Sequence, residues 1–101
     1  MTPQHFGNRL LIVDDDEPFR LRLARAFRKR GYSVDPAANP TQVNDLLQQG
    51  APPDYAVIDL RMPEGSGLSL IPAILQAAPA CRIVLLTGYG SIATAVEAVR
   101  L

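Results

Sequence analysis

The stretch LLIVDDDEP, residues 10–18, places four apolar residues directly before three aspartates and a glutamate. A short apolar run is typical of a buried strand, and Pro18 suits the first turn of a helix. Three neighbouring carboxylates repel one another, so some would hold a proton unless a positive charge lies among them. The stretch therefore predicts a strand, an acidic turn and a helix, with a cation suspected at the turn.

The size and charge of the chain limit its function. Its 101 residues suit one domain, which we place at residues 9–101 behind a flexible arm of residues 1–8. The formal net charge is zero, which argues against direct nucleic acid or membrane binding. No apolar run near the start is long enough for a signal peptide, and the single cysteine, Cys81, cannot form an internal disulfide. We expect a cytoplasmic domain in which Cys81 is a small buried residue.

Apolar runs alternate with amphipathic segments along the whole chain. We expect strands at Arg9–Val13, Tyr32–Asp35, Tyr55–Ile58 and Cys81–Leu86, and helices from Pro18 to Gly31, over Pro40–Gln49, from about Gly67 to Ala77, and from Ser91 through Val99. Continuous apolar strands that alternate with helices favour a doubly wound parallel sheet covered on both faces. Ligands bind such sheets at the carboxyl ends of the strands.

Oxygen-bearing side chains stand at three of these strand ends. Asp14, Asp15 and Asp16 follow the first strand, Asp59 follows the third, and Thr87 follows the fourth. Converging carboxylates form a site for a hard divalent cation, and an oxygen-only set favours Mg²⁺ or Mn²⁺. The alternative is that the first three aspartates only cap the following helix.

Three motifs in this order, LLIVDDDEP, YAVIDLRMPEGSGL and RIVLLTGYGS, resemble the receiver domain of bacterial two-component response regulators. The sequence around the first and last of these motifs is similar to that of response regulators of the RegA/PrrA type. The resemblance runs from Leu10 to Leu101 and implies a flavodoxin-like, CheY-like fold with strand order 2-1-3-4-5. Because the sequence stops at Leu101, we expect a truncated domain without the fifth strand and helix, and without a downstream DNA-binding output domain.

The resemblance also implies a role for each site residue. Asp59 would accept a phosphoryl group from a phosphohistidine of a sensor histidine kinase. Asp14, Asp15, Asp59 and the backbone carbonyl of Arg61 would hold magnesium, and Thr87 would supply the switch hydroxyl. Such a domain is no enzyme in the usual sense, because it catalyses only its own phosphorylation and dephosphorylation.

Arg61 and Tyr89 stand two residues after Asp59 and Thr87, where family members flank the path of attacking water. Large side chains there imply slow loss of the phosphoryl group.

Two other functions stay open. One is a haloacid-dehalogenase-like phosphatase, in which Asp14 of an Asp14-x-Asp16 pair would be phosphorylated. The other is an interaction module that is not phosphorylated and dimerises through an open edge at Arg82–Leu86 or through its last helix.

Several residues carry structural expectations. Six of the ten basic residues lie between Arg20 and Arg30, and we interpret them as a solvated helix face or a docking surface for a kinase. Asp16 is expected to cap the first helix. Gly65 and Gly67 are expected to adopt positive φ in a turn, and Pro72 to kink the third helix from its interior.

Overall fold

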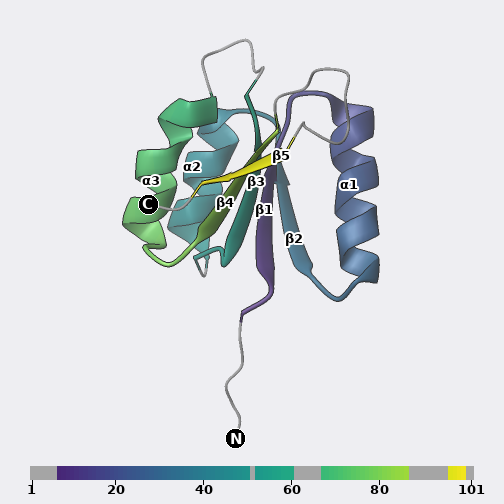
Figure 1. Cartoon of the computed structure of the whole chain (residues 1–101), viewed down its shortest axis with the longest axis horizontal. Coiled ribbons are helices and arrows are strands. Elements are labelled where there is room, and N and C mark those ends of the chain that lie inside the picture. The colour runs from purple at the N-terminus through teal and green to yellow at the C-terminus, as the bar shows by residue number, and fades with distance from the viewer. Residues whose placement is uncertain (1–6, 51, 61–66, 87–95, 100–101) are drawn as a thin grey trace, which may run out of the picture.

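A mostly parallel sheet with helices on both faces forms the domain (Figure 1). The computed structural model describes residues 7–50, 52–60, 67–86 and 96–99. In chain order the elements are β1 (Arg9–Val13), α1 (Glu17–Lys29), β2 (Ser33–Ala37), α2 (Pro40–Gln49), β3 (Tyr55–Asp59), the 3₁₀ turn η1 (Gly67–Leu70), α3 (Ile71–Ala77), β4 (Arg82–Leu86) and β5 (Val96–Val99). The strand order is β2-β1-β3-β4-β5, and the first four strands are parallel. The predicted doubly wound sheet is confirmed.

The central strand β1 contributes to the core on both faces of the sheet. Leu10 and Ile12 pack with Ala24 of α1, whereas Leu11 and Val13 pack in the larger core beneath α2 and α3. This alternation follows from the period of two in a strand. All four side chains are at most 3% exposed, because each face of β1 is covered by a helical layer. The apolar run in the sequence is thus explained by burial on two sides.

The helix ends follow from local chemistry. The Asp16 carboxylate accepts a hydrogen bond from the backbone N–H of Phe19 and caps α1, as predicted. Gly31, just after this helix, has a φ of 97°, a conformation that glycine adopts without strain. At α2, the Asn39 side chain accepts from the N–H of Gln42. These caps bound both helices close to the residues expected.

The connection into α3 differs from the prediction. The turn η1 covers Gly67–Leu70, and α3 begins only at Ile71, so Pro72 lies in the first helical turn. Proline is tolerated there, because the first N–H groups of a helix have no intrahelical partner. The predicted interior kink at Pro72 is therefore wrong. Positive φ at Gly67 is also wrong, since Gly31 alone shows it among the described glycines; Gly65 lies outside the described residues.

The segment 96–99 corrects two further predictions. We expected the last helix to include Val96 and Val99, but these residues form strand β5, antiparallel to β4. Leu86 pairs with Val96 and Ile83 with Val99, so the edge at Arg82–Leu86 is covered rather than open. Pairing satisfies the backbone groups of an edge strand, which gives a physical reason for this arrangement. The sheet thus has five strands where we expected four.

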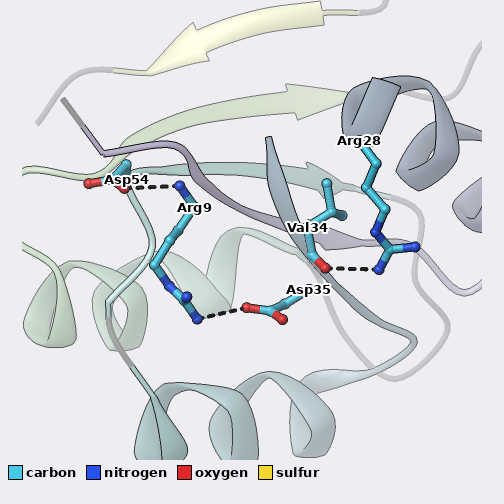
Figure 2. A network of polar contacts seen from close by, with 5 residues as sticks. All are labelled: Arg9, Arg28, Val34, Asp35 and Asp54. Carbon is cyan, nitrogen blue, oxygen red and sulfur yellow. Dashed lines mark hydrogen bonds and ion pairs between the residues drawn. The ribbon is translucent and has the colours of Figure 1, made fainter. Parts of the chain in front are cut away.

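Polar contacts connect β1, β2, α1 and the residue before β3 (Figure 2). The backbone N–H of Arg9 donates to Asp54 Oδ2 at 3.0 Å, and Arg9 Nη2 lies 3.2 Å from Asp35 Oδ2. Nearby, Arg28 Nη2 donates to the carbonyl oxygen of Val34 at 3.0 Å. The first two contacts join the first residue of β1 to β2 and to the residue before β3, and the third joins α1 to β2.

Candidate acidic site

Three carboxylates meet at the carboxyl ends of β1 and β3. Val13, the last residue of β1, pairs with Ile58 of β3, so Asp14 and Asp59 come next at the same level of neighbouring strands. One oxygen of each of Asp14, Asp15 and Asp59 lies within 4.8 Å of the others. We call these three residues the acidic trio. The predicted convergence of these side chains is confirmed.

Asp14 is held by its backbone and by its side chain. Its N–H donates to the carbonyl oxygen of Ala37 at 3.1 Å, and its carbonyl oxygen accepts from Arg20 Nη1 at 2.8 Å. Its Oδ1 accepts from the N–H of Asp16 at 2.9 Å. Asp14 is 4% exposed, and these bonds leave its carboxylate little freedom to turn away from its neighbours.

The electrostatics of the trio favour a cation. Burial is the largest cause that raises the pKa of Asp14, and the charges of Asp59, Asp15 and Asp16 also raise it, against a lowering by the hydrogen bond from the Asp16 N–H; together they bring this pKa to about 6. The folded domain therefore places a carboxylate where ionisation is unfavourable, and a divalent cation would relieve this. The donors are all carboxylate oxygens, the ligands that Mg²⁺ and Mn²⁺ prefer. The residues present fit such an ion.

Asp59 is 8% exposed and stands on a tightly packed strand end. The chain after it is fixed by a hydrogen bond from the N–H of Leu60 to the carbonyl oxygen of Leu86 at 3.0 Å. A Cβ at Gly67 would lie only 2.6 Å from the carbonyl oxygen of Asp59, so glycine is needed where η1 crosses the end of β3. Sequence reasoning missed this role of Gly67; the contact joins residues eight positions apart.

Arg20 was also missed as a site neighbour, because we grouped it with the solvated basic residues of α1. Its position four residues after the cap Asp16, one turn into the helix, was the available signal. Arg22, Arg25 and Lys29 on the same helix are exposed, as that interpretation predicted. Three other predicted site residues, Arg61, Thr87 and Tyr89, lie outside the described residues.

Two further residues bear on the alternatives. Asp16, the second aspartate of the pair that suggested a haloacid-dehalogenase-like phosphatase, uses its carboxylate to cap α1 and is not part of the trio. Cys81 is buried, and burial, with a smaller contribution from Asp54, raises its pKa to about 11. It is therefore a thiol at neutral pH, in agreement with a packing role.

The fold and the acidic trio together define the class of protein. A doubly wound sheet with an acidic trio at the switch point between β1 and β3 is a flavodoxin-like α/β domain with a candidate ligand site. The model of the response regulator receiver domain family matches residues 10–101, and the chain belongs to this family. It is a signalling domain of two-component systems. None of the described helices has the length and apolar character to cross a bilayer.

Known proteins similar to this chain agree with the family. The photosynthetic apparatus regulatory protein RegA of Cereibacter sphaeroides is 50% identical over 92 residues, which cover 91% of this chain and 50% of RegA. The chain thus spans about half the length of this curated relative. A response regulator from Burkholderia pseudomallei, solved with a phosphorylated aspartic acid and a calcium ion, aligns with a TM-score of 0.75 and 39% identity, over 86% of this chain and 51% of that one.

A second solved protein is the response regulator TrrA of Thermotoga maritima. Its complex with Mg²⁺ and BeF aligns with a TM-score of 0.71 and 31% identity, over 82% of this chain and 71% of that one. Its complex with the histidine kinase ThkA aligns with a TM-score of 0.70 and 30% identity, over 84% of this chain and 72% of that one. The predicted CheY-like fold is confirmed by these likenesses.

Proposed function

We propose that this domain accepts a phosphoryl group on Asp59 from a phosphohistidine of a sensor histidine kinase, with Mg²⁺ or Mn²⁺ bound. The observation that carries the proposal is the meeting of the carboxylates of Asp14, Asp15 and Asp59 within 4.8 Å. The phosphorylated aspartic acid and calcium ion in the Burkholderia protein support it, as does Mg²⁺ with BeF in TrrA. The TrrA complex with ThkA supports a kinase as the donor.

The chemistry asks mainly for positioning and charge neutralisation. A carboxylate oxygen of Asp59 forms a bond to phosphorus while the bond between phosphorus and the histidine nitrogen breaks. The nitrogen keeps the electron pair and takes a proton. Asp14, Asp15, Asp59 and the carbonyl of Arg61 would hold the cation, which would neutralise the phosphoryl oxygens. The buried end of β3 holds Asp59 in place. The Thr87 hydroxyl, as the switch hydroxyl, would turn toward the phosphoryl group on Asp59.

The domain catalyses only its own phosphorylation and dephosphorylation. We propose that it passes its signal to a DNA-binding output domain elsewhere in the full-length protein. The match to half of RegA, itself a regulatory protein, supports such a partner. The zero net charge supports a domain that does not contact DNA itself. We place this exchange with a kinase in the cytoplasm.

We also propose that two copies of this chain associate. Among the described residues the sheet ends at β5 (Val96–Val99), whose outer edge has no strand beside it. Unpaired strand edges favour pairing with a second chain. A homodimer through this strand predicts a sedimentation coefficient that rises with concentration, and a strictly monomeric chain would contradict it.

Incubation with acetyl phosphate and Mg²⁺ tests the phosphorylation. Mass spectrometry should find one phosphoryl group on Asp59, and none after Asp59→Asn. Asp45→Asn, the same change at an exposed position of α2, is the matched control and should leave the labelling unchanged. Equal labelling of the Asp59→Asn chain would overturn the assignment, and a phosphoryl group on Asp14 would favour the phosphatase alternative.

A further inference from the structure

Arg20 occupies an unusual place for a cation. It is the fourth residue of α1, and the positive end of a helix disfavours a positive side chain in the first turn. Its side chain is partly buried, whereas Arg22 and Arg25, two and five residues further along the helix, are exposed. A partly buried guanidinium at the wrong end of a helix needs a specific contact to offset these costs.

That contact is the acidic turn itself. Arg20 Nη1 donates to the carbonyl oxygen of Asp14 at 2.8 Å, and the backbone N–H of Arg20 donates to the carbonyl oxygen of Asp16 at 2.8 Å. One residue therefore holds the turn at both ends, from its side chain and from its main chain. The guanidinium meets a main-chain oxygen, so this hydrogen bond fixes the backbone rather than pairing with a carboxylate.

The geometry points to Arg20 as a positioning residue for the acidic trio: we propose that it holds the Asp14–Asp16 turn in the arrangement that receives the divalent cation. The inference rests on the proposed function, because it takes the trio as the cation site. Without Arg20, the like charges of Asp14, Asp15 and Asp59 would push the turn apart. Residues that orient metal ligands typically change affinity by about 10- to 100-fold when they are replaced.

Whether Arg20→Gln weakens or tightens Mg²⁺ binding separates a positioning role from a simple effect of charge. Arg20→Gln removes a positive charge beside an acidic site, and charge alone would tighten Mg²⁺ binding. Arg25→Gln, at an exposed position of the same helix, removes the same charge without touching the turn and is the matched control. If Arg20 positions the turn, calorimetric titration with Mg²⁺ will show binding weaker by about 10-fold in Arg20→Gln, and unchanged or slightly tighter binding in Arg25→Gln.

A second variant and a second measurement complete the test. Arg20→Lys keeps the charge and one donor, so we expect affinity between those of the wild type and Arg20→Gln. Faster amide exchange at Asp14–Asp16 in the metal-free Arg20→Lys chain should accompany the loss. Affinity in Arg20→Gln equal to that of Arg25→Gln would overturn the positioning role. A wild-type chain that binds no Mg²⁺ or Mn²⁺ would instead overturn the cation site and the inference with it.

Discussion

Replacing Asp14 by asparagine should stabilise the metal-free domain while it abolishes the response to magnesium. Asp14 is 4% exposed, and burial together with the charges of neighbouring aspartates raises its pKa from 3.8 to about 6. Because the folded-state pKa lies above the ordinary value, folding favours the protonated carboxyl. The ionised form therefore lowers the free energy of unfolding, and this loss develops as the pH rises from about 4 to about 6 and is complete above.

The size of the effect follows from the pKa. A difference of about two units, at about 1.4 kcal/mol each, makes the ionised Asp14 destabilising by roughly 3 kcal/mol. Asparagine has nearly the same shape, keeps an oxygen that accepts the Asp16 N–H and carries no charge. The free energy of unfolding of Asp14→Asn should exceed that of the wild type by about 2–3 kcal/mol at about pH 7.5, and by about 1 kcal/mol at about pH 4.5.

Urea unfolding in EDTA, followed by circular dichroism at both pH values, measures these differences. Asp45→Asn, at an exposed position of α2, is the control and should change stability by no more than about 0.5 kcal/mol at either pH. Added Mg²⁺ should then stabilise the wild type but not Asp14→Asn. A gain that is the same at both pH values, or a loss of stability at the higher one, would refute burial and repulsion of Asp14 as the cause.

Three more predictions concern other residues of the chain. Asp16→Ala removes the cap of α1 and should cost about 1 kcal/mol in urea unfolding while Mg²⁺ binding persists; loss of binding would show that Asp16 is a ligand. Gly67→Ala forces a Cβ against the Asp59 carbonyl, and should cost about 1–3 kcal/mol and slow phosphoryl labelling; an unchanged rate would mean that η1 shifts freely. Arg61→Ala with Tyr89→Ala should speed dephosphorylation, as followed by loss of the label, and an unchanged rate would remove that expectation.

The strands and the trio were predictable because each depends on a strong local signal. The run Leu10–Val13 can be buried only as a strand covered on both faces, and the aspartates that follow it mark the end of the strand. Asp59 follows a second such run, and parallel pairing brings the two ends together without further information. The caps at Asp16 and Gly31 likewise depend on neighbouring residues alone.

The features that sequence reasoning missed depend on tertiary contacts. The helical spacing of Val96 and Val99 was overridden by pairing with β4, which offers backbone partners that no local pattern records. Pro72 fits the first turn of α3 because η1 takes up the preceding residues. From the sequence, Arg20 resembled the other solvated cations of α1. Its hydrogen bond to the carbonyl oxygen of Asp14 exists only because the folded turn brings that oxygen to its side chain.

The burial of β1 on both faces links the site to global unfolding. Its side chains join both cores, and strands pair with it on either edge, so its amides can exchange with solvent only when the whole domain opens. The acidic turn continues directly from this strand at Asp14. A cation bound there would therefore stabilise the strand that we expect to open last, and we expect that local fraying of a helix or an edge would not release it. We therefore expect hydrogen-exchange protection of the β1 amides to rise when the acidic trio binds a cation.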